Sequence, residues 1–307
     1  MRCFVTGGSG FVGSWTVRRL VEQGWGVAVL SRSGASQHRL QGLGSDIELV
    51  EADLADSARI NQFLRAWRPD ACLHCAWYTE PGKYLESSQN LDCMRDSLAL
   101  LELLVEADCR KIVMVGTCGE YDTNIGYLRE SSAVGPSTLY AASKLATYLV
   151  ATQRAAQLKA DFSWARMFSV FGPGEDERRM APALIRSLLS GREFQASSGD
   201  QVRDYLYVED AAAGLVYLLQ FSESGLFNVS SGEPISVRRL MNMMGDEIGA
   251  PDLIRFGSAP QRDWEPPFIC GDSSRLRCLG WSPQYDLRQA ICMTIEYWRT
   301  RGTVANT

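Results

Sequence analysis

The sequence of 307 residues contains few histidines, a common metal ligand in proteins. It has two histidines, His38 and His74, and His74 stands inside the C-x-x-C pair Cys72–Cys75. A zinc site would need further ligands at a suitable spacing. A redox pair would be expected at a helix N-terminus, whereas residues 71–76 have the pattern of a buried strand. We therefore predict no metal site and interpret these cysteines as buried thiols.

The chain also lacks an excess of positive charge, a long apolar run and a disulfide framework. Its net charge is −5, which argues against non-specific nucleic-acid binding. Apolar stretches such as Ala211–Leu219 are about half as long as a bilayer span. The nine cysteines are scattered, as in proteins of a reducing compartment. The N-terminus has the pattern of a strand entering a turn, not of a signal peptide. We predict a soluble, cytoplasmic protein without nucleic-acid or membrane partners.

Short apolar runs alternate with segments of helical periodicity through the first half of the chain. Such alternation predicts an α/β fold with a parallel sheet covered on both faces. The expected strands are Cys3–Thr6, Val27–Leu30, Ile47–Val50, Ala71–Ala76, Ile112–Val115 and Phe162–Met167, the last of which we expect to close the sheet. The expected helices are Phe11–Gln23, Ser57–Trp67, Leu91–Ala107 and Ser137–Lys159.

Beyond residue 170 the alternation loosens, and Pro and Gly cluster at several points. Helical spacing recurs at Ala181–Leu189, Ala211–Leu219 and Val237–Ile248. We predict a doubly wound, Rossmann-type domain of residues 1–170 plus a crossover segment of about 201–230. Residues 171–200 and 231–307 are predicted to form a smaller, mixed α/β domain that binds substrate.

Gly7, Gly10 and Gly13 follow the first expected strand and open the first helix. Residues without Cβ let backbone N–H groups approach a pyrophosphate at the positive end of a helix. Glycines alone are weak evidence, because tight turns also need them. Here strand, glycines, helix and second strand follow in the right order, so we predict a dinucleotide site.

The end of the second strand indicates the type of dinucleotide. NAD sites commonly carry an acidic residue there, whereas this chain has Ser31 and Arg32. A guanidinium can pair with the 2′-phosphate of NADP, so we predict NADP(H), with NAD(H) as the alternative if Arg32 is only a solvated loop residue. Asp53, before Leu54, is placed to bind the adenine amino group.

Tyr140 and Lys144 lie four residues apart at the start of an expected helix, and Thr117 ends the preceding strand. Residues i and i+4 share one helix face, so phenol and ammonium can converge on one ligand. A nearby cation stabilises a phenolate and is expected to lower the pKa of Tyr140. Most Y-x-x-x-K sequences are ordinary helix surface, and the combination with the glycine turn and Thr117 distinguishes this one.

Several segments together resemble the extended short-chain dehydrogenase/reductase family, in its nucleotide-sugar epimerase, dehydratase and reductase branch. The matching segments are Thr6–Gly13, His74–Ala76, Gly116–Tyr121, Tyr140–Lys144, Arg166–Gly174, Arg203–Asp210, and Arg262 before Asp272–Trp281. The resemblance implies that Thr117, Tyr140 and Lys144 are catalytic. It also implies cofactor contacts from Gly7, Gly10, Phe11, Val12, Ser31, Arg32, Asp53, Leu54, Cys75, Ala76, Tyr140 and Lys144. Arg203 and Arg262 would grip the substrate diphosphate, although each could instead pair with a neighbouring acid.

Three departures from the family pattern narrow the expected activity. Cys118 and Gly119 stand where 4,6-dehydratases of the family carry an acidic pair, so that reaction is disfavoured. Ser169 replaces the usual asparagine, which affects one phosphate contact. Ser31 and Arg32 depart from the acidic pattern of epimerases that retain NAD.

The segment Ala76–Leu85 resembles deoxysugar enzymes, and its side chains could line a sugar pocket or serve loop packing. The residues concerned are Trp77, Tyr78, Glu80 and Lys83. From the sequence we predict an NADPH-dependent reductase of a nucleotide-linked 4-keto-6-deoxyhexose. The alternatives are a nucleotide-sugar 4-epimerase with tightly bound NAD and a non-catalytic dinucleotide-binding regulator.

The resemblance also implies a homodimer that pairs through the helices Leu91–Ala107 and Ser137–Lys159. Candidate interface residues are Leu98, Leu101, Leu145 and Leu149. Packing within one chain would explain these leucines equally well.

Overall fold

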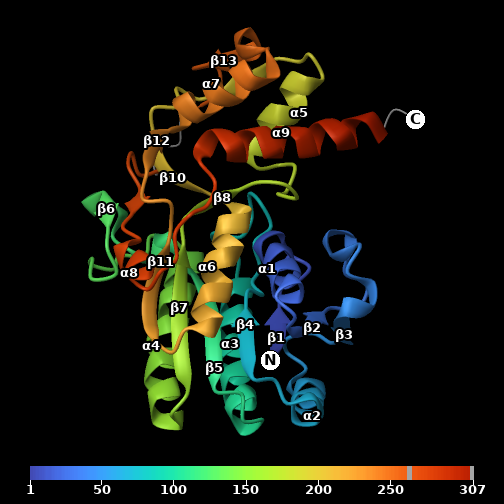
Figure 1. Ribbon diagram of the computed structural model, residues 1–307. Coiled ribbons are helices and arrows are strands. Elements are labelled where there is room, and N and C mark those ends of the chain that lie inside the picture. Colours follow the sequence, from blue (N-terminus) through green and yellow to red (C-terminus); the bar gives the residue numbers. More distant parts are fainter. Residues whose placement is uncertain (261–264, 305–307) are drawn as a thin grey trace.

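The computed structural model describes residues 1–260 and 265–304. Figure 1 shows a large part built on a central sheet and a smaller lobe above it. A seven-stranded parallel sheet has the strand order β11-β7-β5-β4-β1-β2-β3. Its strands are β1 (Arg2–Thr6), β2 (Gly26–Ser31), β3 (Ile47–Glu51), β4 (Ala71–His74), β5 (Lys111–Thr117), β7 (Asp161–Met167) and β11 (Gly225–Val229). The predicted Rossmann-type α/β class is confirmed.

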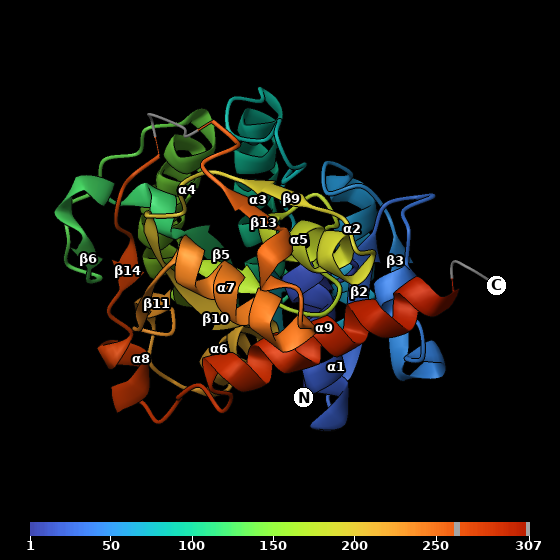
Figure 2. The ribbon, with the colours of Figure 1, turned by 90° about the horizontal axis from the view of Figure 1, so that it is seen from above.

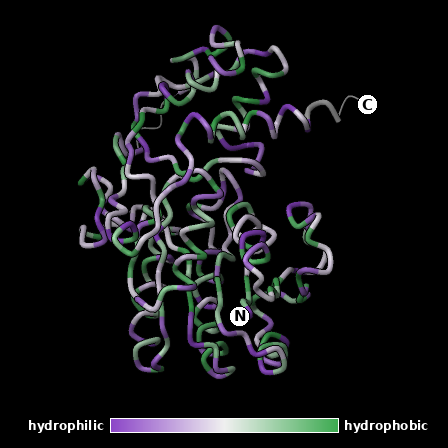
Figure 3. The backbone as a smooth tube through the Cα atoms, viewed as in Figure 1, coloured by the Kyte–Doolittle hydropathy of each residue, from purple (hydrophilic) through white to green (hydrophobic). Residues whose placement is uncertain are grey.

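Helices cover both faces of the sheet, because its strands are apolar on both sides. One face packs against α1 (Phe11–Glu22) and α6 (Val208–Gln220), and the other against α2 (Ser57–Trp67), α3 (Gln89–Glu106) and α4 (Leu139–Leu158). In Figure 3 the strands carry many of the hydrophobic segments. Within residues 1–260 and 265–304, no helix combines the length and apolar character needed to cross a bilayer.

Two predictions about the sheet are wrong. β7 does not close the sheet, because β11 pairs with it in register from Gly225 opposite Ser163 to Val229 opposite Met167. The fourth strand ends at His74 rather than Ala76, because the chain turns there to pass the glycine loop. Cys75 and Ala76 therefore lie in the loop after β4.

A smaller lobe packs above the sheet, as Figures 1 and 2 show. It contains α5 (Met180–Leu189), α7 (Val237–Ile248) and α9 (Leu287–Val304), with the short parallel strands β9 (Phe194–Ala196) and β13 (Ile254–Phe256). Leu184, Ile185, Leu240, Met244 and Ile291 belong to its own buried core. The domain boundaries given above stay a prediction. Within the segment 201–230, α6 packs on the large sheet and β11 pairs in it, whereas β10 (Val202–Tyr207) pairs in a small sheet.

A second small sheet connects the two parts of the molecule. In it β10 (Val202–Tyr207) pairs in parallel with β8 (Ser169–Phe171) and antiparallel with β12 (Pro234–Ser236). β6 (Tyr127–Leu128) pairs with β14 (Cys270–Gly271). The remaining short helices are η1 (His38–Leu40), η2 (Gly44–Asp46), η3 (Cys118–Glu120), η4 (Thr123–Ile125), η5 (Pro251–Leu253) and α8 (Ser274–Cys278).

Candidate active site

The glycine turn between β1 and α1 lies against the loop that follows β4. Gly7 has a φ of +70°, and a Cβ there would lie 2.6 Å from the Ala76 nitrogen. A Cβ at Gly13 would lie 2.2 Å from the Gly7 carbonyl oxygen, so the turn needs glycine at both positions. The N-cap of α1 is Gly10, which has no side chain to accept from the first N–H groups of the helix, so these groups can face an anion. Phe11 and Val12 open the helix. The turn fits a dinucleotide pyrophosphate.

A buried hydrogen-bond chain fixes the end of β4 beside this turn. His74 is 2.7 Å from Thr6 Oγ1 through Nδ1 and 2.7 Å from Ser97 Oγ through Nε2. Ser97 Oγ donates to the Cys93 carbonyl, and Ala76 N donates to Thr6 Oγ1. Burial, with a smaller effect of Lys144, lowers the pKa of His74 to about 3, so its ring is neutral. The chain holds Cys75 and Ala76 at the predicted cofactor site.

A cavity of about 520 Å³ lies at the carboxyl ends of β2 and β3. Ser31 is buried beside it, and its Oγ has no hydrogen-bond partner among the described residues. Asp53 Oδ1 accepts a hydrogen bond from Ala55 N, and the adjacent Leu54 packs on the core. The cavity is lined by Arg32, Ser33, Glu51, Ala52, Asp53, Asp56 and Arg59. It is suited to the adenosine end of a dinucleotide, and Arg59 is a second guanidinium that we did not anticipate.

Thr117 and Tyr140 meet at the carboxyl end of β5. Thr138 caps α4 by accepting from Ala141 N, and Tyr140 N donates to the Leu85 carbonyl. The half-buried Tyr140 packs edge-on against Tyr84, with ring centroids 4.9 Å apart. The Thr117 side chain lies next to the Tyr140 hydroxyl and acts to lower its pKa. Such a pair can share one proton with a ligand oxygen.

Lys144 lies one turn along α4 and is 3% exposed. Its Nζ donates to the Val115 carbonyl at 2.6 Å. Burial lowers the pKa of Lys144 to about 8, although Glu120 acts in the opposite direction. The expected lowering of the Tyr140 pKa by Lys144 is not found. The pKa of Tyr140 is raised, because burial and the neighbouring Tyr84 outweigh the Thr117 hydrogen bond.

Glu120 anchors Thr117 and was not anticipated. Its buried carboxylate is 2.7 Å from Arg166 Nε, and it accepts a hydrogen bond from Thr117 N at 2.8 Å and from Trp164 Nε1 at 3.0 Å. Gly119 N in turn donates to Thr117 Oγ1. The motif Gly116–Tyr121 indicated a functional strand end. It did not indicate that Glu120 would bind Trp164 and Arg166, which lie 44 and 46 residues farther along the chain.

Some side chains of the loop after β4 contact Tyr140, and others form a cluster of polar contacts around Glu80. Trp77 and Tyr84 pack against the Tyr140 ring. Tyr78 instead donates to Glu80 at 3.0 Å, and Lys83 pairs with Glu80 at 3.0 Å. The Lys83 side chain is 68% exposed. The structure therefore brings neither Tyr78 nor Lys83 into contact with Tyr140.

Arg203, one of the two residues predicted to bind the diphosphate, lies on β10. It is 7% exposed, and its Nη2 is 2.9 Å from Glu265. Arg203 therefore pairs with a carboxylate that is distant in sequence. The neighbouring Asp204 is not its partner, because Asp204 accepts hydrogen bonds from Ser231 N and Gly232 N. Ser169 begins β8, opposite Tyr205 of β10. Arg262 lies outside the described residues.

Cys118 and Gly119 occupy the turn after Thr117. Burial raises the pKa of the Cys118 thiol to about 12, so this group is neutral near pH 7. It cannot replace the carboxylate of an acidic pair. The site therefore lacks the groups that we associated with 4,6-dehydration.

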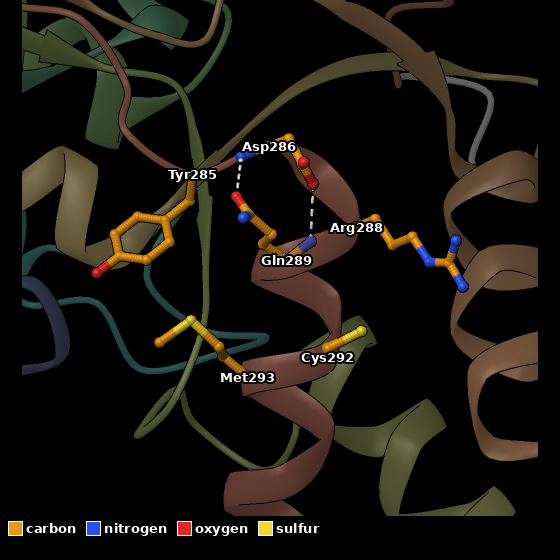
Figure 4. Close-up of a pocket in the computed structure, with 6 residues that line it drawn as sticks. All are labelled: Tyr285, Asp286, Arg288, Gln289, Cys292 and Met293. Atoms are coloured by element: carbon orange, nitrogen blue, oxygen red, sulfur yellow. Dashed lines mark hydrogen bonds between the residues drawn. The ribbon is translucent and has the colours of Figure 1, made fainter.

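Metal clusters, disulfides and other cavities are further features that could mark a functional site. The described residues contain no cluster of three or more potential metal ligands, and all nine cysteines are free. A cavity of about 410 Å³ lies at the start of α9, where Asp286 and Gln289 exchange hydrogen bonds that cap the helix (Figure 4). It contains none of the predicted site residues.

Comparison with known proteins places this site in a family. The model of the NAD dependent epimerase/dehydratase family matches residues 3–230. A UDP-glucose 4-epimerase of Mycolicibacterium smegmatis is 30% identical over 323 residues, covering 98% of this chain and 100% of the relative. The Thermus thermophilus UDP-glucose 4-epimerase, solved with NAD, is 25% identical, with a TM-score of 0.84 and coverage of 97% and 99%. A dTDP-glucose 4,6-dehydratase of Streptomyces venezuelae, also solved with NAD, is 25% identical, with a TM-score of 0.86 and coverage of 99% and 98%.

The sequence motifs, the glycine turn and the end-to-end relatives all agree on one assignment. The resemblance stated from the motifs is confirmed, and the chain is an enzyme of the nucleotide-sugar branch. It belongs to the NAD-dependent epimerase/dehydratase family.

Proposed function

We propose that the protein is a nucleotide-sugar 4-epimerase. The pairing of Thr117 with Tyr140, one turn from Lys144 and next to the glycine turn, is the observation that carries this proposal. The relatives that match from end to end are named as 4-epimerases, which favours epimerisation over the 4-keto reduction predicted from the sequence.

Bound NAD(P) would supply a hydride acceptor and donor at its nicotinamide ring. Gly7, Gly10, Phe11 and Val12 would hold its pyrophosphate, with Cys75 and Ala76 on the nicotinamide side. Ser31, Arg32, Asp53 and Leu54 would bind its adenosine half. Lys144 would hold the nicotinamide ribose.

Tyr140 would take the proton of the C4 hydroxyl as a phenolate while C4 is oxidised to the ketone. Because burial raises the pKa of Tyr140, this role would need the positive charges of Lys144 and of the oxidised nicotinamide to stabilise the phenolate. Thr117 would donate a hydrogen bond to the C4 oxygen. After the sugar presents its other face, Tyr140 would return the proton to the C4 oxygen, with Thr117 as its hydrogen-bond partner, as the C4 hydroxyl is restored. Arg203 would exchange Glu265 for the substrate diphosphate.

Reduction of a 4-keto-6-deoxysugar is the second candidate, and one observation favours it. Arg32 and Arg59 line the adenosine cavity, where their guanidinium groups can meet the 2′-phosphate of NADPH. A reductase would exchange its cofactor in every cycle, whereas an epimerase regenerates it within one turnover.

Interconversion assays distinguish the two reactions. UDP-, dTDP-, GDP- and CDP-linked hexoses are incubated with the purified protein and no added cofactor. Epimerisation of one of them to its C4 epimer supports the proposal. Loss of NADPH absorbance with a 4-keto-6-deoxysugar, and no epimer from any hexose, would replace it with the reductase.

We further propose a cytoplasmic homodimer. The outer faces of α3 and α4 expose Leu91, Leu149 and Val150, which are 48%, 53% and 51% exposed. Two of the four leucines named above do not fit this role, because Leu101 and Leu145 are buried within the chain. Leu98 also packs partly on the core, so Leu149 is the best remaining candidate.

A further inference from the structure

Trp77 lies directly against the charged end of Lys144. The Nζ of Lys144 is 3.8 Å from the centroid of the Trp77 ring. Among the described residues, no carboxylate lies within ion-pair distance of this ammonium, which donates a hydrogen bond to the Val115 carbonyl. The positive charge therefore lies between a carbonyl oxygen and the face of Trp77, with the centroid of the Trp164 ring farther away at 5.9 Å.

The indole ring is itself held in place by a fully buried amide. Trp77 Nε1 donates to Asn90 Oδ1 at 2.8 Å. The Asn90 amide nitrogen donates to the Tyr84 and Ser87 carbonyls at 2.7 and 2.8 Å, and Asn90 is 0% exposed. The same indole lies edge-on to Tyr140, with ring centroids 6.4 Å apart. Few other orientations of the ring would satisfy these contacts.

An aromatic face attracts a cation most strongly where water is excluded. The other titratable groups around Lys144 are Glu120 after β5, His74 and Cys75 after β4, and Cys93 on α3. The histidine is neutral, and burial raises the pKa of both thiols. Burial also raises the pKa of Glu120, and its ion pair with Arg166 opposes this shift and favours the carboxylate. The aromatic face of Trp77 thus acts with Glu120 against the burial that disfavours the ammonium.

We propose that Trp77 is a positioning residue that holds Lys144 charged and oriented for the nicotinamide ribose. This inference rests on the proposed function in one respect, namely that Lys144 binds the nicotinamide ribose. It replaces the sugar-pocket role considered for Trp77 on sequence grounds.

The test measures cofactor binding against pH and needs no sugar substrate. The dissociation constants of NADH and NADPH are determined by calorimetry from pH 6 to 10 for Trp77→Phe and Trp77→Leu. Trp67→Leu is the matched control, because Trp67 stacks on Phe63 in α2 and lies over Arg2 rather than Lys144.

We expect binding by the parent protein to weaken as the pH rises through about 8, where Lys144 loses its proton. Trp77→Leu should move this midpoint at least half a pH unit lower, and Trp77→Phe should move it less. Trp67→Leu should leave it in place. An unchanged midpoint in Trp77→Leu would overturn the proposal.

A double-variant cycle with Lys144→Met separates an effect through Lys144 from a general disruption of the fold. Trp77→Phe is used in the cycle if Trp77→Leu does not fold. In the Lys144→Met background the Trp77 substitution should have no further effect on binding. An equal loss in both backgrounds would contradict the proposal. Because turnover is not measured, loss of the epimerase assignment would leave this result standing.

Discussion

Tyr140 is the residue on which the proposed chemistry depends, because it holds the proton exchanged with the C4 oxygen. Replacing Tyr140 with Phe removes the hydroxyl and keeps the ring that packs on Tyr84 and Trp77. We expect turnover to fall by about 10²- to 10⁴-fold, as for loss of a general acid–base group. The dissociation constant of the dinucleotide should stay within about twofold. Steady-state kinetics and calorimetry check both, and full activity in Tyr140→Phe would exclude the mechanism.

At this scale the sequence motifs indicated candidate catalytic side chains, which stay a prediction, but not the residues that the structure packs against them. Tyr140 and Lys144 are four residues apart on one helix, so local spacing was sufficient. Glu120 meets Arg166 across 46 residues, and Asn90 meets Trp77 across 13. Such pairs depend on strand and helix packing, which no local pattern encodes. The same applies to the Tyr140 pKa, whose direction depends on burial.

The ion pair between η3 and β7 is expected to stabilise the strand end that carries Thr117. Glu120 and Arg166 are 0% and 1% exposed, so Glu120→Gln leaves a buried guanidinium without its counter-charge. We expect the free energy of unfolding to fall by about 3 kcal/mol. Urea denaturation measures this change.

The exposed pair between Arg154 and Glu102 provides the matched control for that experiment. Glu102→Gln should cost less than about 1 kcal/mol, because water screens exposed ion pairs. Equal losses in the two variants would contradict the special role given to Glu120.

The link that His74 makes between β1, β4 and α3 predicts a pH dependence of stability. The pKa of His74 is about 3 in the folded state, against 6.5 for the free side chain. Below pH 6.5 the unfolded chain binds a proton that the folded chain does not, so stability falls as the pH decreases toward 3. At pH 5 the loss relative to pH 7 should be about 2 kcal/mol.

Urea titrations of the parent protein and of His74→Gln at pH 7 and pH 5 check this expectation. The variant should lose less stability between the two pH values, whatever its stability at pH 7. His38→Gln, at an exposed position, should retain most of the parent slope. An unchanged slope in His74→Gln would refute the buried neutral state.

Most elements of the large sheet could be predicted, because short apolar runs and helical periodicity alternate clearly up to residue 167. β11 was not predicted as a sheet strand, since Gly225–Val229 is short and follows a long helical segment. The paired two- and three-residue strands of the small sheets depend on contacts between distant segments. β11, the seventh strand, could therefore be assigned only from its pairing with β7 in the folded sheet.

At the scale of the whole molecule, the exposed leucine of α4 predicts the assembly. Leu149→Glu places a charge at the proposed dimer interface and should convert dimers to monomers in sedimentation velocity experiments. Leu49→Glu is the control, since Leu49 is 44% exposed on β3, away from α3 and α4. A parent protein that sediments as a monomer would contradict the dimer.

The central claim, a 4-epimerase that keeps its cofactor, is tested most directly by identifying what the purified protein carries. The protein is denatured, the released small molecules are measured by mass spectrometry, and the stripped protein is titrated with NADH and NADPH. The account predicts close to one NAD for each chain. An empty site that binds NADPH at least tenfold (about 1.4 kcal/mol) more tightly than NADH would contradict it and assign Arg32 and Arg59 to a reductase.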